Sequence, residues 1–574
     1  MRRIRSLALV VAVSAAFLPA GSAYAGGSFT LYGSGWGHGL GLSQWGAYGL
    51  AKQGWHAEQI LTHFYSGTKV KSARQPPKEI RVALATGEVR IHLTAADGPV
   101  HLWANALGGK PIGTIATGST WVVRAIDGAY RVLDDAGAVV GDHDWGSATS
   151  NLYVSYLDDT ARVTSPEGGA TYNRGHLEFN LTGCPNGCSL RLIAQLPFEE
   201  YLYGIGEVPS SWPMESLRAQ AIAARSFALY KIRKYGVQES CNCHVWDGSN
   251  DQVYVGWDKE GGTDGHRWRK AAISTANKIV TYEGTVALTV FTASDGGHTE
   301  DLNVQWGTPL TSYPYLAGVC DPGENTSANP WTDWSRTFSA GALTTALSPY
   351  TGDVGRVSGF GKVRRGVSGR IIDAVLHGGA GDATVTGSEL RSALSLPDDR
   401  VWINADRNVL GAIRTKYDSL MCEPGLPMST TKTLPGGSRQ VFATGAIYRN
   451  TGADASVWLK GAIYDEYLGV GGAPGTLGLP LNDPVNLAAV RGLSCPQGCS
   501  RAEFTHGRVF WKAAVGAHAL WGRVLQAYLA QDGAGGALGF PMSRVQQQSD
   551  GSASATFEHG AISCSGEACH VTSN

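Results

Sequence analysis

The sequence predicts an α+β fold with a β-rich part, one long central helix and a smaller, repetitive C-terminal domain. Alternating apolar and polar runs at residues 80–84 and 190–194 are typical of half-buried strands. The segment 213–235 has the spacing of small apolar residues that predicts a closely packed helix. Residues 472–480 return as residues 533–541, and repeats of this size usually stack around a shared core.

The composition indicates a folded, multidomain protein. The chain has 574 residues, with 43% hydrophobic and 17% charged residues, which is unlike a disordered chain and too long for one ordinary domain. A net charge of −1 gives no electrostatic signature for binding nucleic acid. The 17 Trp and 22 Tyr residues suit stacking on sugar rings, but aromatic residues also fill β-rich cores, so both interpretations remain.

The N-terminus has the features of a secretory signal peptide over residues 1–25. Arginines at positions 2, 3 and 5 precede an apolar run at residues 7–18, and Ala23-Tyr24-Ala25 fits a cleavage site. No later segment has the continuous apolar length of a transmembrane helix. We therefore expect an exported protein that is extracellular or associated with the cell wall.

Ten cysteines fit an oxidising compartment. The sequence predicts three short-range disulfides, which are Cys184–Cys188, Cys495–Cys499 and Cys564–Cys569. The partners of the other four stay open, namely Cys241, Cys243, Cys320 and Cys422.

A zinc site is a weak alternative for one group of these residues. Cys241, Cys243 and His244 can supply three ligands. The C-x-C spacing is tighter than in usual structural sites, so disulfide bonding is the preferred interpretation. We predict no other metal or cofactor.

The long helix has identifiable ends. Ser211 is placed to cap it, Pro213 is tolerated in its first turn, and Gly236 stops it. Its packing face is formed by Leu217, Ala221, Ala224 and Ala228. A shorter helix is expected around residues 57–64.

The remaining chain divides by composition. A glycine-rich segment covers residues 26–70, a β-rich part residues 79–203, and mixed strands and helices residues 204–410. Residues 421–439 are rich in Pro, Gly, Ser and Thr and are predicted to be a linker. The repeats occupy residues 440–574, with 442–445 as a partial early copy, and we expect them to bind or to act as spacers.

Glu207 is the strongest candidate for catalysis. It lies between Ile205 and Val208, and an apolar setting would raise its pKa, as a general acid requires. The positive end of the following helix would lower the pKa. On local chemistry alone, a capping carboxylate is an equally good interpretation. The preceding Glu199 and Glu200 are expected on the surface.

Two polar residues lie on the small-residue side of the long helix. Gln220 and Arg225 need partners there. They can form structural hydrogen bonds and ion pairs, or they can line a cleft with Glu207. The glycine turn at 295–300 is by itself a weak signal.

Four segments together resemble the SpoIID/LytB family. Residues 198–225 resemble its long core motif, from the Glu-Glu-Tyr-Leu start through Glu-Met-Pro to the helical Ala-Ala-Arg end, with Val208 in place of Met. The other three segments are 294–300, 385–391 and 35–44.

In the usual family order, the motif at residues 35–44 closes the domain. Here it comes first, so the sequence resembles a circular permutation. We therefore expect residues 27–70 to pack beside residues 380–405, with His38 near Glu207. The resemblance implies a SpoIID-type domain over residues 26–420 whose central helix forms one side of a glycan cleft. The C-terminal part resembles LGFP repeats, which implies attachment to the bacterial envelope.

The resemblance also implies an activity. SpoIID proteins resemble lytic transglycosylases of peptidoglycan, and the implied catalyst is Glu207. It would protonate the glycosidic oxygen between N-acetylmuramic acid and N-acetylglucosamine, and then accept the proton of the muramic C6 hydroxyl. The residues implied to bind glycan or orient Glu207 are His38, Ser43, Gln44, Gln220, Arg225, Ser294, Gly296, Gly297 and Glu300.

The same resemblance bears on metal and partners. Some members carry zinc with a cysteine in a Cys-Gln-Val-Tyr stretch, but here Asp251 stands at that cysteine position, which makes it a weak substitute ligand. The implied partners are peptidoglycan strands, a wall amidase, and an envelope component bound by the repeats. A non-catalytic amidase enhancer is the main alternative activity. A purely structural envelope protein is the third, but it leaves the core motif unexplained.

Overall fold

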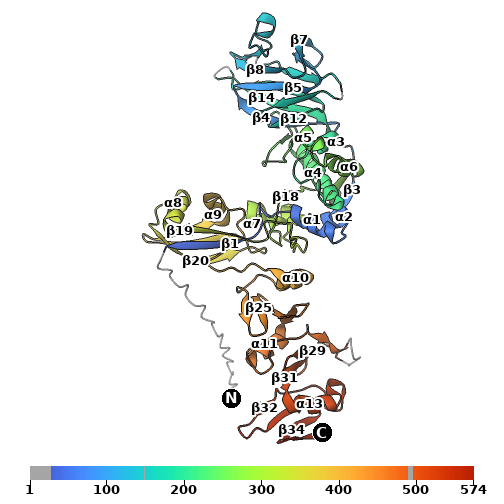
Figure 1. Ribbon diagram of the computed structural model, residues 1–574, viewed down its shortest axis with the longest axis vertical. Coiled ribbons are helices and arrows are strands. Elements are labelled where there is room, and N and C mark those ends of the chain that lie inside the picture. The colour runs from blue at the N-terminus through green and yellow to red at the C-terminus, as the bar shows by residue number, and fades with distance from the viewer. Residues whose placement is uncertain (1–26, 148, 159, 185–186, 489–494, 574) are drawn as a thin grey trace, which may run out of the picture.

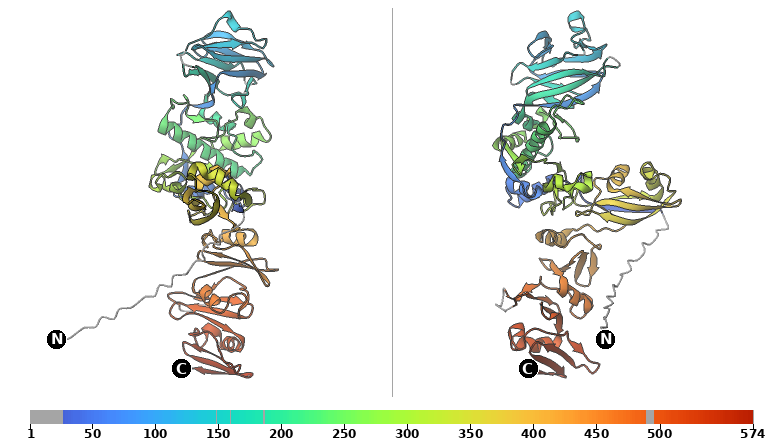
Figure 2. Two further views of the ribbon diagram at one scale, coloured as in Figure 1. Left: turned by 90° about the vertical axis from the view of Figure 1, so that its left-hand side faces the viewer. Right: turned by 180° about the vertical axis from the view of Figure 1, so that it is seen from behind.

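The computed structural model describes residues 27–573, apart from residues 148, 159, 185–186 and 489–494. The predicted signal peptide lies outside the described residues. The chain is elongated, with a β-rich domain at one end and small sheets at the other, and helices and a mixed lobe lie between them (Figures 1 and 2). This arrangement confirms the α+β class. None of the described helices is both long enough and apolar enough to cross a bilayer.

The β-rich domain consists of two sheets around one apolar core. In β5, Ile91, Leu93 and Ala95 are buried while the residues between them are not, as expected for a strand with one face on a core. The larger sheet contains, in spatial order, β15 (Val245–Trp246), β4 (Glu79–Glu88), β14 (Ser189–Pro197), β13 (His176–Thr182), β10 (Leu152–Tyr156), β6 (Val100–Ala104) and β7 (Lys110–Ile115). The smaller sheet contains β12 (Ala170–Tyr172), β11 (Arg162–Ser165), β5 (Arg90–Asp97), β8 (Thr120–Ile126) and β9 (Ala129–Leu133).

The long helix is α4 (Met214–Tyr235), and it ends at Gly236, whose φ of 63° is left-handed. The predicted apolar face is buried in the core. The predicted cap is wrong: Pro213 is the N-cap residue, and no side chain caps it. The first helical bond runs from the Leu217 N–H to the Pro213 carbonyl, so Ser211 lies too far upstream to act as cap.

The N-terminal segment packs against distant parts of the chain, as expected. Strand β1 (Ser28–Gly33) pairs with β19 (Trp334–Ser339) on one side and with β23 (Val401–Ile403) on the other. Helices α1 (Gln44–Lys52) and α2 (Ala57–Phe64) contact α4, so the segment also forms part of the helical region. The circular permutation that motivated this expectation stays a prediction.

The other strands and helices of this part form two groups. One group surrounds α4, and the other forms a mixed lobe around β1. Around α4 these are α3 (Phe198–Tyr201), η2 (Leu202–Gly204), α5 (Trp257–Glu260), α6 (Gly265–Ser274), β3 (Lys69–Ser72), β16 (Lys278–Tyr282), β17 (Thr285–Val286), and β18 (Phe291–Thr292) paired with β2 (Leu42–Ser43). In the mixed lobe they are α8 (Ala340–Thr351), β20 (Val357–Arg365), β21 (Ile371–Gly378), β22 (Asp382–Thr386) and α9 (Gly387–Leu394). Two further elements, α7 (Leu302–Trp306) and η4 (Pro314–Leu316), share the apolar core of α1, α2 and α4. Helix α10 (Gly411–Ser419) packs against the first C-terminal sheet.

The C-terminal region contains three four-stranded antiparallel sheets in chain order, with α11 (Gly461–Gly469) and α13 (Gly522–Ala530) following the first and second (Figure 1). Neighbouring sheets share an apolar core, which confirms the predicted stacking. The strands are β24 (Lys432–Leu434), β25 (Gly437–Phe442), β26 (Gly445–Asn450) and β27 (Val457–Lys460); β28 (Val485–Asn486), β29 (Cys499–Phe504), β30 (Gly507–Lys512) and β31 (Gly516–Trp521); and β32 (Gln546–Gln547), β33 (Ala553–Phe557), β34 (Gly560–Ser565) and β35 (Ala568–Ser573).

The predicted linker at residues 421–439 is wrong, because it contains β24 and the start of β25. The same bridge recurs in each sheet, from Pro427 to Phe442, from Pro480 to Phe504 and from Pro541 to Phe557. The first repeat is therefore complete and begins before residue 427. Thr, Ser and Lys tolerate an exposed strand, so composition alone did not separate this strand from a linker.

All five disulfides connect described cysteines. The three short-range predictions are confirmed. Cys241 bonds Cys243, and Cys320 bonds Cys422 across 102 residues of sequence. The last bond ties the loop before β19 to the segment that leads into the first repeat.

Candidate active site

A cavity of about 610 Å³ lies where the N-terminal segment, the region around α4 and the mixed lobe meet. Its volume falls within the range of small-molecule sites. Three of the predicted site residues, His38, Gln44 and Glu207, line it together. The expected approach of the N-terminal motif to Glu207 is therefore found. The other lining residues are Trp36, Gly37, Phe227, Ser249, Asn250, Asp251, Val253, Val290, Phe291, Thr292, Ala293, Trp306 and Arg391.

Glu207 lies between η2 and α4, and its two oxygens have different surroundings. Oε1 accepts a 2.6 Å hydrogen bond from the Val253 N–H. Oε2 accepts a longer one, 3.4 Å, from Nε2 of Gln44. Burial raises the pKa of Glu207 above its ordinary 4.5, and these two bonds and the Lys259 charge offset only part of the effect. Burial therefore outweighs the local donors, so this carboxyl keeps its proton to a higher pH than an exposed glutamate does.

The second carboxylate among the described lining residues is held differently. Asp251 Oδ1 lies 2.8 Å from the Lys231 ammonium, and Oδ2 accepts the Trp246 N–H at 2.9 Å. Its side chain is 2% exposed. Both oxygens are engaged, so Asp251 is poorly placed to act as a base or nucleophile.

Two exposed indoles flank the cavity. Trp36 is 45% exposed and Trp306 is 47% exposed. The His38 ring packs edge-on against Trp306, at 5.4 Å between centroids. Exposed aromatic faces beside a cavity with both apolar and polar lining residues are suited to stacking on sugar rings.

His38 is a neutral part of the wall. Its Nδ1 accepts the Leu40 N–H at 3.0 Å. Burial and the positive charges of Arg370 and Arg391 lower its pKa to about 4. At neutral pH it therefore carries no charge, and its Nδ1 is engaged by the backbone of its own loop.

Two predicted residues on α4 do not line the cavity. Arg225 is fully buried and binds Glu199 through Nε and Nη2, and it also donates to the carbonyls of Lys278 and Ala272. This matches the structural ion pair that the sequence left open. Gln220 is 2% exposed, and neither of its amide atoms has a partner among the described residues.

Three predicted residues, Ser43, Ser294 and Gly296, donate instead to one buried carboxylate, Glu324. Ser43 caps α1 by accepting the Gly46 N–H, and it donates to Glu324 at 2.9 Å. Ser294 donates to the same carboxylate, and the Gly296 N–H does so at 3.3 Å. Gly297, at a φ of 104°, lies against the Arg414 guanidinium, where a Cβ would clash.

The remaining predicted residue is also structural. Glu300 is buried and accepts hydrogen bonds from the Val367 N–H and from the backbone and hydroxyl of Ser368. It holds the turn between β20 and β21. These residues thus support the cavity from behind or lie outside it.

The weak zinc alternative does not fit this arrangement. The sulfurs of Cys241 and Cys243 bond each other, and His244 Nδ1 accepts the Arg81 N–H at 3.0 Å. Asp251 is bound to Lys231. The four candidate ligands are therefore engaged elsewhere, and we do not propose zinc here.

Sequence reasoning missed several lining residues. Trp36 and Arg391 both lie inside quoted motifs, so their segments were found but not their roles. Trp306 carried no signal, because nothing local ties the end of α7 to Glu207.

Two family models match parts of the chain. The family model described as stage II sporulation protein matches residues 186–282, which include Glu207 and α4. The LGFP repeat model matches residues 477–536.

Three curated relatives are similar over part of the chain. An uncharacterised protein of Brachyspira hyodysenteriae is 30% identical over 179 residues, which cover 30% of this chain and 45% of that protein. The amidase enhancer of Bacillus subtilis is 34% identical over 139 residues, covering 24% of this chain and 17% of the relative. Stage II sporulation protein D of Bacillus subtilis is 27% identical over 215 residues, covering 36% and 59%. The chain thus spans less than two thirds of each relative, and it carries a domain of the stage II sporulation protein D family together with LGFP repeats.

Proposed function

We propose that this protein is an exported lytic transglycosylase that cuts peptidoglycan glycan strands, with Glu207 as its single catalytic residue. The observation that carries the proposal is the Glu207 carboxyl, whose raised pKa and place in a cavity wall beside Gln44 suit a general acid. The names of two relatives, a sporulation protein D and an amidase enhancer, support a cell-wall-related role.

The two Glu207 oxygens have different roles in this proposal. Because Oε1 already accepts the short bond from Val253, the acid proton is best carried on Oε2. Oε2 donates this proton to the glycosidic oxygen, and the leaving sugar departs with it. The resulting carboxylate then accepts the proton of the C6 hydroxyl as O6 attacks C1, which closes a 1,6-anhydro ring. Both proton transfers use the same carboxyl, and it ends protonated as it began.

The state of Asp251 supports ring closure over hydrolysis. An inverting hydrolase needs a second carboxylate to activate water, and a retaining one needs a nucleophile. Asp251 is tied by Lys231 and the Trp246 N–H. A sugar hydroxyl that serves as the internal nucleophile removes the need for a second carboxylate.

We further propose that residues 27–420 hold the glycan and that the three C-terminal sheets fix the protein to the cell wall. The LGFP match supports an anchoring role. The repeats lie at the opposite end of the elongated chain from the β-rich domain (Figure 2), which would let the anchored chain reach neighbouring strands.

Mass spectrometry of products from peptidoglycan, intact and amidase-stripped, tests the activity. We expect 1,6-anhydro ends from the wild type and none from Glu207→Gln. If the wild type instead produces reducing ends and Glu207→Gln produces none, the reaction is hydrolysis and not ring closure.

Amidase enhancement is the second candidate, because one relative carries that name. It predicts no glycan products, and wall binding that persists in Glu207→Gln. An added wall amidase would then release more peptide in the presence of either form.

A further inference from the structure

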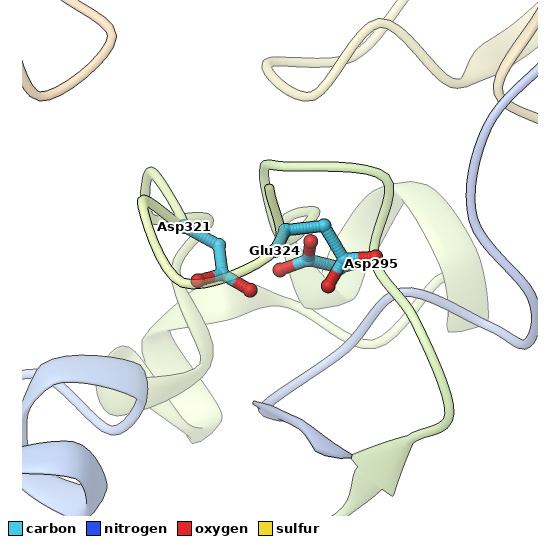
Figure 3. Close-up of side chains that lie close together, drawn as sticks. All are labelled: Asp295, Asp321 and Glu324. Atoms are coloured by element: carbon cyan, nitrogen blue, oxygen red, sulfur yellow. The ribbon is translucent and has the colours of Figure 1, made fainter. Parts of the chain in front are cut away.

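Three buried carboxylates converge behind the cavity wall (Figure 3). Asp295 lies in the loop between β18 and α7, whereas Asp321 and Glu324 lie in the loop between η4 and β19. All three side chains are 0% exposed. One oxygen from each lies within 4.8 Å of the others.

Two of these carboxylates have an oxygen without a donor. Oδ2 of Asp295 and Oδ2 of Asp321 are buried and accept no hydrogen bond from the described residues. Glu324 differs, since Ser43, Ser294, Gly296 and Asn329 all donate to it. The oxygens without a donor therefore belong to the two aspartates, while the neighbouring glutamate accepts several hydrogen bonds.

The nearest guanidinium groups do not neutralise the cluster. Arg414 pairs with Asp418 at 2.6 Å and reaches Asp321 only at its backbone carbonyl. Arg370 likewise pairs with Asp398 at 2.8 Å and reaches Asp295 only at the carbonyl. Each arginine thus pairs directly with its own aspartate, and the three clustered carboxylates form no direct ion pair among the described residues. Buried charges of one sign are costly unless a cation or protons join them.

We propose that Asp295, Asp321 and Glu324 bind a divalent cation, and that the cation is Ca²⁺. The donor set is entirely hard oxygen, which suits Ca²⁺ and Mg²⁺. Mg²⁺ usually keeps several of its waters and demands near-ideal octahedral geometry, whereas Ca²⁺ accepts flexible sets of protein oxygens. Three fully buried carboxylates within 4.8 Å of one another leave little room for such waters and therefore favour Ca²⁺.

Such an ion would join the two loops that carry the carboxylates and would brace the start of α1 through Glu324. Glu324 holds Ser43, the cap of α1, and the next residue is Gln44, which donates to Glu207. A Cβ on Gly46 would fall 1.9 Å from Asp321 Oδ2, so α1 lies directly against the cluster. The cation would therefore fix the helix start that positions Gln44.

Protonation is the competing way to relieve the repulsion. Burial and the neighbouring Glu324 charge raise the pKa of Asp295 to about 8. Under this alternative, the carboxyls share protons and no ion is needed.

The test strips the full chain with EDTA, removes the chelator, and titrates Ca²⁺ at pH 7.5. We expect about one Ca²⁺ per chain by elemental analysis after re-equilibration. Saturating Ca²⁺ should raise the Tm by roughly 5–10 °C, while equal Mg²⁺ should give less. In Asp321→Asn this Ca²⁺-dependent rise should disappear, whereas the exposed control Asp258→Asn should keep it.

Two results would overturn the proposal. They are wild type without bound Ca²⁺ and a Tm that Ca²⁺ does not change, and either would favour shared protons. The wild-type binding measurement decides the question even if the variant does not fold. The test measures bound metal and Tm, so its outcome does not depend on whether the protein cleaves glycan.

Discussion

The cavity and the C-terminal repeats are built from contacts at different distances along the chain. Gln44 and Glu207, which meet in the cavity, are 163 residues apart. In the repeats, the Tyr467 hydroxyl binds the Gly478 carbonyl and the Tyr528 hydroxyl binds the Gly539 carbonyl, each 11 residues on. A repeat is thus specified largely within itself, whereas the cavity exists only once three regions have packed.

The two regions also treat a carboxylate in opposite ways. Burial of Glu207 raises its pKa, while Glu558, although burial acts upward there too, has a lowered pKa because Lys512 and the Phe540 N–H bind it. The surroundings of Glu207 therefore stabilise its protonated form relative to water, whereas those of Glu558 stabilise its charged form. The predictions below test this contrast.

The largest expected effect is on catalysis. Glu207→Gln should lower the rate of glycan cleavage by about 10²–10⁴-fold, because the amide cannot donate the acid proton. Glu558→Gln, the same change in the repeats, should leave the rate within about twofold. Single-turnover assays on amidase-stripped glycan measure both. Comparable losses in the two variants would remove Glu207 from its proposed role.

The next effect concerns stability. Replacing Cys320 and Cys422 by serine opens a 102-residue loop and should cost about 4–5 kcal/mol in a chain-entropy estimate. Replacing Cys564 and Cys569 opens a five-residue loop and should cost about 2 kcal/mol. Denaturant unfolding of both double variants gives the difference. Equal costs would mean that the long bond adds no constraint beyond local packing.

Glycan affinity should depend on the exposed indole at the cavity. Trp306→Ala should weaken the binding of a soluble glycan fragment by roughly 5–30-fold, as expected for the loss of about 1–2 kcal/mol from a tryptophan contact. Leu481→Ala removes an exposed apolar group of the repeats and should not alter this affinity. Titration calorimetry on the Glu207→Gln background avoids turnover. Unchanged affinity in Trp306→Ala would place the sugar elsewhere.

Within the repeats, equivalent positions should give equivalent effects. Tyr467→Phe and Tyr528→Phe each remove one hydroxyl-to-carbonyl bond and should cost about 0.5–1.5 kcal/mol without changing cleavage. Thermal unfolding measures the costs. A clear inequality would show that the sheets are not interchangeable units.

The smallest effect is the pH dependence of stability. The folded pKa of Glu207 lies above its unfolded value near 4.5, so its stabilising contribution is complete below that value and is lost as pH rises through the folded pKa. Glu558 has the opposite sign, and its contribution is lost as pH falls below 4.5. The Tm of each Glu→Gln variant relative to wild type, measured from pH 4 to 8, should therefore rise for Glu207 and fall for Glu558. If the Tm differences of the two variants changed with pH in the same direction, the two carboxylates would not have opposite pKa shifts.

Much of the architecture followed from local patterns. Alternation located β4 and β14, small-residue spacing located α4, and turn-like loops paired six cysteines. The errors were also local: the start of α4 was set by Pro213 rather than Ser211, and a polar strand was taken for a linker. Both errors concern ends of elements, where weak preferences compete.

The candidate site was less accessible from sequence. The motifs brought His38, Gln44 and Glu207 to one cavity, but they did not separate residues that face it from residues that support it. Ser43, Ser294 and Gly296 turned out to hold Glu324, and Arg225 to hold Glu199. A motif selects residue types over a stretch, whereas exposure depends on the packing of every neighbour.

The sequence by itself determined the β-rich part, the central helix, the stacked repeats and the short-range disulfides, because each depends on residues close along the chain. Only the tertiary structure decided the cavity, the Cys320–Cys422 bond and the convergence of Asp295, Asp321 and Glu324. Burial and unpaired charge are properties of the folded surroundings, and no local pattern encodes which distant side chains will face a given carboxylate.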